Sequence, residues 1–480
     1  MNKYTSLKEV KKELQESKIS CVGLVEYFLE RIYSSKSINA FIEVYDEAAK
    51  HQALEVDKKI KTKTEGKLAG LVVSIKDNIC YEGHHVSASS KMLEGFESLY
   101  SATVVERLLE EDAIIIGRTN CDEFAMGSSN ETSYYGPVVN PHDETKVAGG
   151  SSGGAAASVA AGMCMAALGS DTGGSIRQPA SFTGTVGFKP TYGRVSRHGL
   201  IAFGSSFDQI GTFTTNVEDA ALILEVISGK DKFDSTLSKK SVPSYIEQFG
   251  KQEKKNKKIA YLDCYVDHEG IDPEVKSKTL KVIEELKEEG HQVDKISFDY
   301  LHEMVPTYYV LTTAEASSNL ARYDGIHFGY RSESAHDLES TYVKSRSEGF
   351  GKEVKRRIML GTYVLSAGYY DAYYTKAQKV RRLVKEKTNE ILETYDFIIS
   401  PTSPHTAFEL NAQTNDQIKM YLEDIFTVQA NLAGIPAISL PIGEKEKMPF
   451  GIQLMGGAFK EADLLAFSKE LMNKFQLIKA

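Results

Sequence analysis

Residues 146–155 read Lys-Val-Ala-Gly-Gly-Ser-Ser-Gly-Gly-Ala, and residues 169–177 read Gly-Ser-Asp-Thr-Gly-Gly-Ser-Ile-Arg. Each stretch encloses a serine, Ser151 or Ser175, in a cluster of glycines, and a short apolar segment separates the two. Glycine lets the backbone approach a ligand closely. A serine in such a turn has free backbone N–H groups beside it, and these are the donors that the oxyanion of acyl transfer needs. We therefore expect a serine nucleophile with a backbone oxyanion hole. Flexible Gly/Ser linkers are the alternative, although linkers do not usually enclose an apolar segment.

A lysine at the end of an apolar run is the second unusual feature. Residues 70–79, Gly-Leu-Val-Val-Ser-Ile-Lys-Asp-Asn-Ile, predict a strand that is buried on both faces and ends at Lys76. Burial without a partner lowers the pKa of a lysine amine, and a neutral lysine can act as a general base. Taken alone, Lys76 is more simply explained by a side chain that leaves the strand end for solvent or pairs with Asp77.

Ser151 also fits the G-x-S-x-G pattern of a nucleophile elbow. That motif requires a strand immediately before the serine and a histidine base later in the chain. Residues 140–145, Asn-Pro-His-Asp-Glu-Thr, predict a loop, and later histidines such as His198, His268 and His291 lie in no distinctive context. The zinc motif H-E-x-x-H and the phosphate loop G-x-x-x-x-G-K-[ST] are absent. A Lys-Ser-Ser arrangement is what remains.

Composition excludes some classes of protein. The 480 residues carry a net charge of −9, which disfavours broad nucleic-acid binding by this chain alone. The five cysteines are scattered without metal-ligand or redox spacing, which indicates a reducing compartment. The first residues lead into a charged amphipathic segment without an apolar signal core, and no apolar run reaches about 18 residues. We expect a cytoplasmic protein without a transmembrane helix.

Strands and helices alternate through much of the chain, which is typical of an α/β layered fold. Ser6 and Glu9 predict a capping box at the start of a first helix. Further predicted strands lie at 40–45, 113–117, 259–265, 397–400 and 437–440, and further predicted helices at 46–63, 103–111, 273–289, 368–392 and 461–475.

The combination of Lys76, Ser151 and Ser175 resembles the amidase signature family. The Lys-Asp-Asn after a strand, the two glycine-serine runs and the separations of 75 and 24 residues stand where that family has them. The resemblance covers residues 5 to 475. It implies a single large α/β/α layered domain at 66–480, with a mixed central sheet flanked by helices and a polar variable stretch at about 228–258. Residues 1–65 would form a helical segment packed on the body or on a partner.

Four further stretches resemble one branch of the family, the A subunits of tRNA-dependent amidotransferases: residues 117–129, 189–197, 353–361 and 424–428. Val72 and Gln429 depart from this pattern, because the family usually has proline there. The resemblance implies a glutaminase that passes ammonia to a B subunit, and a small C subunit that completes a heterotrimer. The B subunit would hold tRNA and use ATP and Mg. No cofactor, metal or membrane contact is expected for this chain.

The resemblance also implies roles for single residues. Ser175 would be the nucleophile, and Ser151, in a cis peptide, would connect it to the base Lys76. Backbone N–H groups of Thr172, Gly173, Gly174 and Ser175 would form the oxyanion hole. Arg357 and Asp424 would hold the carboxylate and ammonium of glutamine, with Tyr308 lining the pocket.

Several alternatives stay open. Arg356 could replace Arg357, and both could be ordinary ion pairs on a helix surface. A stand-alone amidase acting on small amides would also keep the three catalytic residues. The sequence leaves tRNA(Gln) and tRNA(Asn) both open as the RNA that is served.

Overall fold

The computed structural model describes residues 3–249, 256–412 and 417–475. Its strands are β1 (Phe41–Val44), β2 (Val72–Lys76), β3 (Ile114–Thr119), β4 (Val139–Asn140), β5 (Asp143–Val147), β6 (Ala166–Asp171), β7 (Val186–Lys189), β8 (Gln209–Thr214), β9 (Lys258–Leu262), β10 (Gln292–Ile296), β11 (Phe397–Pro401), β12 (Ala437–Lys445) and β13 (Met448–Gly456). Within the described ranges, eleven strands form one mixed sheet in the order β1-β3-β2-β6-β8-β7-β12-β13-β11-β9-β10, and β4 pairs with β5 separately.

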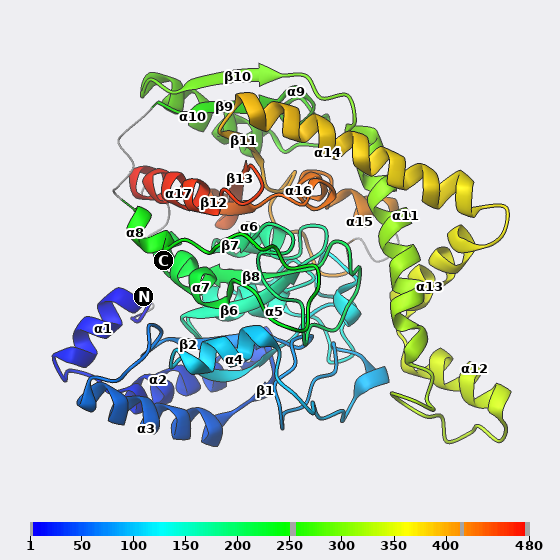
Figure 1. Cartoon of the computed structure of the whole chain (residues 1–480), viewed down its shortest axis with the longest axis horizontal. Coiled ribbons are helices and arrows are strands. Elements are labelled where there is room, and N and C mark those ends of the chain that lie inside the picture. Colours follow the sequence, from blue (N-terminus) through cyan, green and yellow to red (C-terminus); the bar gives the residue numbers. More distant parts are fainter. Residues whose placement is uncertain (1–2, 250–255, 413–416, 476–480) are drawn as a thin grey trace.

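Helices lie on both sides of this sheet (Figure 1). They are α1 (Leu7–Gln15), α2 (Cys21–Ser34), α3 (Asp46–Thr62), α4 (Thr103–Glu110), α5 (Gly153–Ala160), α6 (Arg177–Thr183), α7 (Val217–Ile227), α8 (Tyr245–Gln248), α9 (Asp263–Val266), α10 (Pro273–Glu288), α11 (Leu301–Asn319), α12 (Leu338–Gly349), α13 (Lys352–Leu365), α14 (Lys376–Thr394), α15 (Gln417–Leu422), α16 (Val428–Ala433) and α17 (Glu461–Phe475). The predicted layered α/β fold with a mixed central sheet is confirmed. In the part of the chain that is described, no helix is both long and apolar enough to cross a bilayer.

The strands that matter most for the site are β2 and β6. β2 lies parallel to β3 on one side and to β6 on the other. Every residue of β2 and β6 is buried, as expected for strands covered on both faces. Because parallel strands end at the same edge of a sheet, the residue that ends β2, Lys76, lies near the turn that follows β6.

The N-terminal helices pack on the body of the protein. Buried apolar residues of α1, α2 and α3 belong to the same core cluster as β2 and β3. Ser20 caps α2 by accepting a hydrogen bond from the Gly23 N–H at 3.1 Å. The capping box predicted at Ser6 is wrong, because the Ser6 side chain makes no cap. The Leu7 N–H instead donates to buried Asp219 of α7 at 3.0 Å.

Two other local predictions need correction. Residues 143–147, part of the predicted loop and its continuation, form strand β5, whose mostly polar and partly exposed residues give no apolar signal. The helix predicted at 368–392 begins instead with a π-helical turn, Tyr370–Thr375, and continues as α14. The 3.6-residue period fails in a π turn, so Tyr373 is exposed. The polar stretch predicted at 228–258 lies partly outside the described residues.

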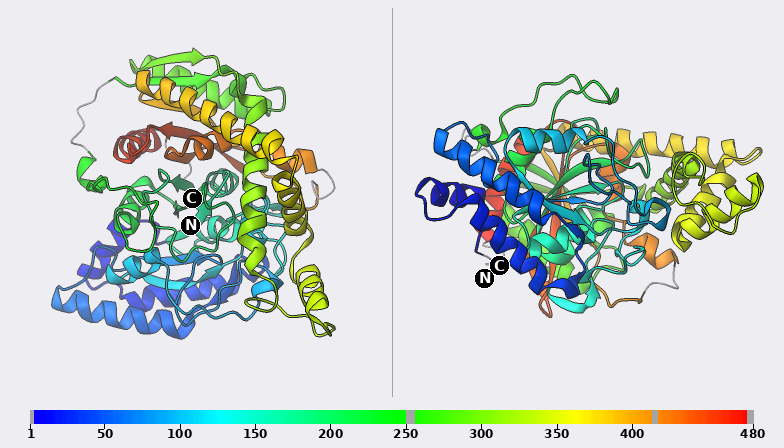
Figure 2. Two further views of the ribbon diagram at one scale, coloured as in Figure 1. Left: turned by 45° about the vertical axis from the view of Figure 1, so that its right-hand side comes forward. Right: turned by 90° about the horizontal axis from the view of Figure 1, so that it is seen from below.

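α13 and α14 form a hairpin that meets the body through α11, because both helices contact α11. Figure 1 and the right-hand view of Figure 2 show that the turn between α13 and α14 lies at one edge of the molecule, away from the sheet.

Candidate active site

Lys76 is the centre of a buried polar cluster. Its side chain is fully buried, and its Nζ donates to Ser151 Oγ at 2.7 Å, Ser152 Oγ at 2.9 Å and Ser170 Oγ at 2.9 Å. Burial lowers the pKa of Lys76, and nearby acidic groups oppose this only in part. The simpler explanations of this lysine are wrong, because the side chain does not reach solvent and Asp77 pairs with Arg118 instead.

Ser151 follows a cis peptide bond between Gly150 and Ser151. The Asp122 N–H donates to the Ser151 carbonyl at 3.0 Å, and the Asp122 carboxylate occupies the space that a Cβ on Gly150 would need. The Ser152 N–H donates to the Ser175 carbonyl at 3.3 Å. This bond joins the two glycine-serine loops that the sequence singled out.

The nucleophile-elbow alternative can now be judged on geometry. β5 precedes Ser151 and α5 follows it, so the strand that seemed to be missing is present, in the small two-stranded sheet. The base is different, however. Within the described ranges, no histidine forms a hydrogen bond with Ser151 or Ser175, and the side chain that bonds to Ser151 Oγ is Lys76. The geometry therefore retains the Lys-Ser arrangement over Ser-His-Asp.

Ser175 lies in the turn between β6 and α6 and is 7% exposed. Among the described residues its hydroxyl has no hydrogen-bond partner, Ser151 included. The same holds for the backbone N–H groups of Thr172, Gly173, Gly174 and Ser175 in this part of the chain. Successive backbone N–H groups with no acceptor form an anion-binding concavity. The structure thus brings Lys76 and Ser151 into contact, and it leaves the Ser175 hydroxyl free beside four unused donors.

Residues from the far end of the chain hold this turn. Arg177 is fully buried and forms an ion pair with Asp171 at 3.0 Å. It also donates to the Thr427 carbonyl at 2.8 Å and to Asn431 Oδ1 at 2.6 Å. Thr427 Oγ1 in turn donates to the Gly173 carbonyl at 2.6 Å. These buried charge-assisted bonds fix the backbone of the turn before any ligand arrives.

Asp208 connects this turn to the next part of the site. Its carboxylate accepts from Thr172 Oγ1 at 2.7 Å, from the Phe203 N–H at 3.0 Å and from the Gly204 N–H at 3.1 Å. Burial raises the pKa of Asp208 to about 6. The Phe203 ring centre lies 5.5 Å from the guanidinium of Arg357. One carboxylate therefore links the turn of free N–H groups to the segment that packs on Arg357.

Arg357 and Asp424 both contact one tyrosine, Tyr309. The Arg357 guanidinium lies 5.2 Å from the ring centre of Tyr309 and 5.6 Å from that of Tyr421. The Tyr309 hydroxyl donates to Asp424 Oδ2 at 3.0 Å. Glu353 Oε1 accepts from Arg357 Nε at 2.8 Å. The site therefore has a cation over the ring of Tyr309 and an anion at its hydroxyl, which suits an amino-acid zwitterion.

The two neighbouring arginines differ in their surroundings. Arg356 also pairs with Glu353, but its side chain is 34% exposed, against 3% for Arg357. The alternative of an ion pair on a helix surface thus describes Arg356 and not Arg357.

Asp424 and Tyr308 complete the part of the site around Arg357, which we call its second half. Burial raises the pKa of Asp424 to about 7, although the Tyr309 hydroxyl and the Arg357 charge oppose the shift. Tyr308 is buried and packs on the glycine turn, where a Cβ on Gly173 would come within 2.5 Å of the Tyr308 hydroxyl. Tyr308 therefore lies where the turn after β6 meets α11.

Some residues of the site were not predicted from the sequence. Ser152 and Ser170 stand next to predicted residues in the two glycine-serine runs, and that proximity was the available signal. Asp208, Tyr309 and Glu353 carry no local motif. They reach the site through the packing of β8, α11 and α13.

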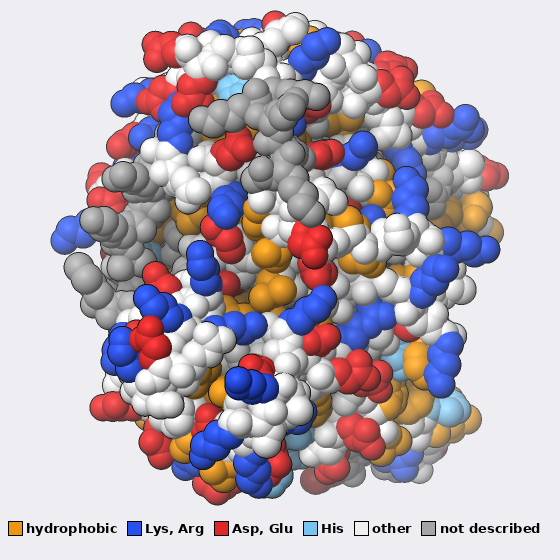
Figure 3. Space-filling view, turned by 60° about the vertical axis from the view of Figure 1, so that its left-hand side comes forward, with side chains coloured by type: hydrophobic (Ala, Val, Ile, Leu, Met, Phe, Trp, Pro, Cys, Tyr) orange, Lys and Arg blue, Asp and Glu red, His pale blue; other side chains and the backbone are white. Residues whose placement is uncertain are grey.

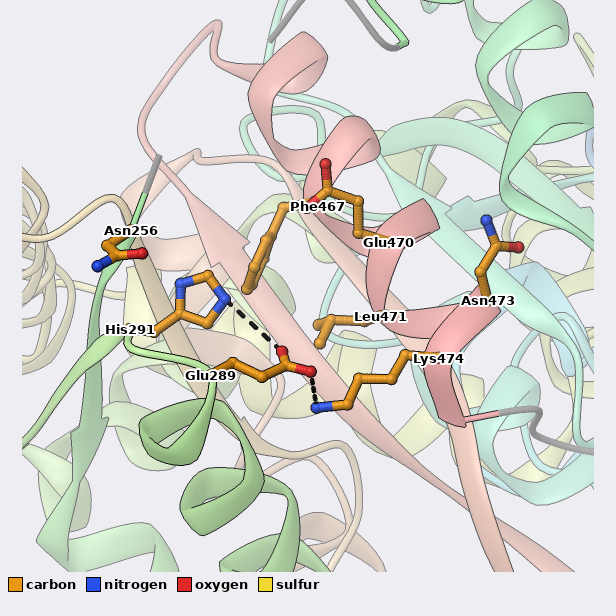
Figure 4. A pocket seen from close by; sticks show the side chains of 8 residues that line it. All are labelled: Asn256, Glu289, His291, Phe467, Glu470, Leu471, Asn473 and Lys474. Carbon is orange, nitrogen blue, oxygen red and sulfur yellow. Dashed lines mark ion pairs between the residues drawn. The ribbon is translucent and has the colours of Figure 1, made fainter. Parts of the chain in front are cut away.

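A surface cavity lies elsewhere, between the end of α10 and α17. Its volume is about 580 Å³, and Glu289 in its wall pairs with His291 at 3.9 Å and with Lys474 (Figure 4). None of the Lys76 cluster lines it. Over the described ranges, His, Cys, Asp and Glu side chains do not gather in groups of three that could hold a metal ion.

Comparison with known proteins points to one family. The family model described as Amidase matches residues 23–465. The chain is 52% identical over 469 residues to the A subunit of glutamyl-tRNA(Gln) amidotransferase from Fusobacterium nucleatum, covering 97% of this chain and 96% of that protein. It is 50% identical over 470 residues to the protein of the same name from Chlorobium phaeobacteroides, covering 98% of each. The crystal structure of the protein of that name from Thermotoga maritima superposes with a TM-score of 0.79 at 39% identity, over 97% of this chain and 93% of that one.

Proposed function

The chain belongs to the amidase family, and we propose that it is the glutamine-hydrolysing A subunit of a tRNA-dependent amidotransferase that works in the cytoplasm. In this proposal it supplies ammonia to a B subunit, which uses ATP and Mg to convert Glu-tRNA(Gln) into Gln-tRNA(Gln). A small C subunit completes the complex. Asp-tRNA(Asn) is a second possible substrate of the same complex, and the chain itself uses no cofactor.

One observation carries the proposal. Within the described parts of the chain, a buried lysine without an acidic partner donates to Ser151, and the Ser151 loop is bonded to a turn that offers a free serine hydroxyl and four free N–H groups. An amine in such surroundings is shifted towards its neutral form. These groups can serve as the base, the proton relay, the nucleophile and the oxyanion hole that acyl transfer requires.

The proposed first half-reaction forms an ester on Ser175. Ser175 Oγ attacks the side-chain amide carbon of glutamine while its proton passes through Ser151 to neutral Lys76. The N–H groups of residues 172–175 stabilise the negative charge that develops on the amide oxygen. Lys76, now an ammonium, returns the proton through Ser151 to the leaving nitrogen, and ammonia departs. The turn is already held by Arg177 and Thr427, so little reorganisation accompanies the reaction.

Water completes the cycle. It attacks the glutamyl ester with Lys76 and Ser151 again taking the proton, and glutamate and free Ser175 result. The sum is glutamine plus water giving glutamate plus ammonia, so the lysine and both serines are regenerated.

Specificity for glutamine is assigned to the second half of the site. Arg357 offers a buried fork for the α-carboxylate, which a guanidinium can bind bidentately. Asp424 is the counterpart for the α-ammonium, and it must be ionised to act. Glu353 already neutralises one of the two neighbouring arginines, so the cluster of Arg356, Arg357, Glu353 and Asp424 is formally neutral and can take up a zwitterion without an excess charge.

A stand-alone amidase for small amides is the alternative function. It would use the same base and serines, but it would not need a buried cation and anion beside the reacting group. Arg357 and Asp424 are both buried and both contact Tyr309, which favours the glutamine-specific function.

The test is ammonia release by the chain co-expressed with its B and C subunits, with and without Glu-tRNA(Gln) and ATP. Ser175→Ala should abolish glutamine hydrolysis. Ser181→Ala, which removes a buried serine hydroxyl bonded to Ser403 and to the Gly451 N–H, is the matched control and should retain it.

Ammonia release that needs Ser175 and rises with the tRNA and ATP would support the amidotransferase. Release from simple amides by the lone chain, indifferent to tRNA and to the partner subunits, would favour the stand-alone amidase. Undiminished hydrolysis in Ser175→Ala would reject the mechanism.

A further inference from the structure

The hairpin of α13 and α14 is strongly basic, although the protein as a whole is acidic. Residues 352–394, which we call the basic hairpin, contain ten Lys and Arg and five Asp and Glu. Their formal charge is +5, while the remaining 437 residues carry −14 and the whole chain −9. The overall charge therefore conceals one local region that can attract a polyanion.

Several of these cations have no acidic partner. Lys352, Lys376, Lys379 and Lys385 are exposed, and among the described residues they form no ion pair. On α14 the buried positions, such as Ala377 and Val384, face the body, so the lysines are turned to solvent. Lys376 and Lys379 are three residues apart, which places them about 60° apart around the helix and about 4.5 Å apart along its axis. The two amines can therefore contact neighbouring phosphates of one nucleic-acid strand.

Aromatic rings lie exposed at the turn of the same hairpin. Tyr363, Tyr369 and Tyr373 are each 42–43% exposed. Their ring centres are 4.3 Å apart for Tyr363 and Tyr369, and about 6 Å apart for the other two pairs. Proteins that bind single-stranded nucleic acid commonly place cations against the phosphates and aromatic rings against the bases. The lysines and the exposed rings of the basic hairpin fit this pattern.

The position of the basic hairpin suits a large partner. Its turn lies at the edge of the molecule in Figure 1 and in the right-hand view of Figure 2, so a bulky polyanion can reach it without crossing the acidic body. The face shown in Figure 3 is different, because Lys and Arg side chains are interspersed there with Asp and Glu.

We propose that the basic hairpin is an RNA-binding surface of this chain, with Lys376 and Lys379 on the phosphates and Tyr369 and Tyr373 stacking on unpaired bases. The choice of tRNA as the RNA rests on the proposed function. An acidic protein surface is the competing occupant. It is disfavoured because lysine is depleted from protein–protein interfaces, whereas unpaired lysines are what phosphate contacts use.

The experiment measures the affinity of labelled, unfractionated tRNA for the full-length chain and for the complex with its B and C subunits, at several KCl concentrations. The first variant is Lys376→Glu/Lys379→Glu, and the second is Tyr369→Leu/Tyr373→Leu. The control is Lys8→Glu/Lys12→Glu, which makes the same charge change at two exposed positions of α1.

The lysine variant should weaken tRNA binding at least tenfold and make the plot of log K against log salt shallower, because each lost phosphate contact removes about 0.7–0.9 from the slope. The tyrosine variant should weaken binding about fivefold or more and leave the slope unchanged. The control should stay within about twofold of the wild type, since its lysines lie outside the proposed contact.

Equal weakening by the control would overturn the proposal, and so would unmeasurable binding by the wild-type chain and complex. Unchanged tRNA affinity in the lysine variant, with loss of the partner subunits on purification, would identify the hairpin as a protein-binding surface instead. Glutamine hydrolysis is followed on the same samples without RNA. Its absence in the wild type would count against the proposed function, whereas loss of tRNA binding alone counts only against the hairpin.

Discussion

The two halves of the site are built in different ways. The half around Lys76, Ser151 and Ser175 consists of turns at the ends of buried strands, and its polar atoms are mainly hydroxyls and backbone N–H groups. The half around Arg357 and Asp424 lies on and between helices, and it relies on opposite charges among aromatic rings. The first half suits a proton transfer and an oxyanion, which depend on position, whereas the second suits recognition of a charged substrate. Variants in the two halves should therefore differ in whether kcat or KM responds.

The largest effect is expected at Lys76. Lys76→Met keeps the length of the side chain but removes the base, so kcat for glutamine should fall about 10³-fold with KM little changed. The control is Lys189→Met. Lys189 is equally buried and burial lowers its pKa to about 7, but among the described residues its Nζ donates only to the carbonyls of Pro190 and Ile435.

Lys189→Met should lose about 1–3 kcal/mol of unfolding free energy, because two buried carbonyls lose their donor, and its kcat should be nearly normal. Steady-state kinetics and chemical unfolding of both variants would check this pair. Equal kcat losses at the two lysines would mean that burial alone, and not the contact with Ser151, explains the effect.

The second prediction concerns the turn that offers the N–H groups. Gly174 has φ of +144°, and a Cβ there would collide with the Thr427 hydroxyl. Gly174→Ala should displace the donors and lower kcat about 10²-fold, with a smaller change in KM. Gly368→Ala is the control, since Gly368 also has positive φ, +86°, but open space around its Cα.

The Gly368 variant should be destabilised by about 1–2 kcal/mol and remain active. Thermal unfolding and kcat would be measured for both variants. A normal kcat in Gly174→Ala would show that the N–H groups of this turn do not form the oxyanion hole.

The third prediction concerns KM for glutamine and the half of the site around Arg357. Arg357→Gln should raise KM for glutamine roughly 30-fold, equivalent to about 2 kcal/mol, because a buried charge contact to the carboxylate is lost. kcat should change less. Arg356→Gln, one residue away on the same helix and partly exposed, should leave KM within about threefold. A larger KM for Arg356→Gln than for Arg357→Gln would reverse the assignment of the two arginines.

The smallest effect is a pH dependence of KM. The pKa of Asp424 is raised to about 7, so its carboxylate is ionised above that pH and becomes protonated below it. KM for glutamine should rise up to about tenfold per pH unit as pH falls below 7. Asp424→Asn should have a high KM that does not vary in this range.

An analogue of glutamine that lacks the α-ammonium separates this effect from the titration of Lys76. Its KM should not depend on Asp424, whereas its kcat still requires neutral Lys76. The same rise in KM for the analogue would show that a group other than Asp424 is responsible.

The difference between the two halves also explains what the sequence could predict. Lys76, Ser151 and Ser175 each stand in a short run whose residue types reveal the chemistry, so elementary reasoning could nominate them. The roles of Arg357 and Asp424 came from a family resemblance, because an arginine on a helix and an aspartate before a turn have no distinctive pattern of their own. Asp208 could not be nominated at all, since its importance lies in contacts with Thr172 and Phe203 that only the folded chain creates.

Errors in the predicted elements have a similar origin. Ser6 had the residue types of a capping box, yet Asp219, more than 200 residues away, accepts the hydrogen bond from the first turn of α1. The overall layered architecture was predictable because it follows from repeated apolar patterns. Contacts that depend on one distant partner were not.

Residues from the far end of the chain hold the turn after β6, so the proposed active site can be completed only late in the synthesis of the chain. Lys76, Ser151 and Ser175 all lie in the first 175 residues, but the groups that hold the turn, Thr427 and Asn431, are synthesised about 250 residues later. A nascent chain on the ribosome therefore carries every proposed catalytic side chain long before the turn can be fixed in place. We expect glutamine hydrolysis to begin only when synthesis is nearly finished, so that the cell does not lose glutamine to unfinished chains.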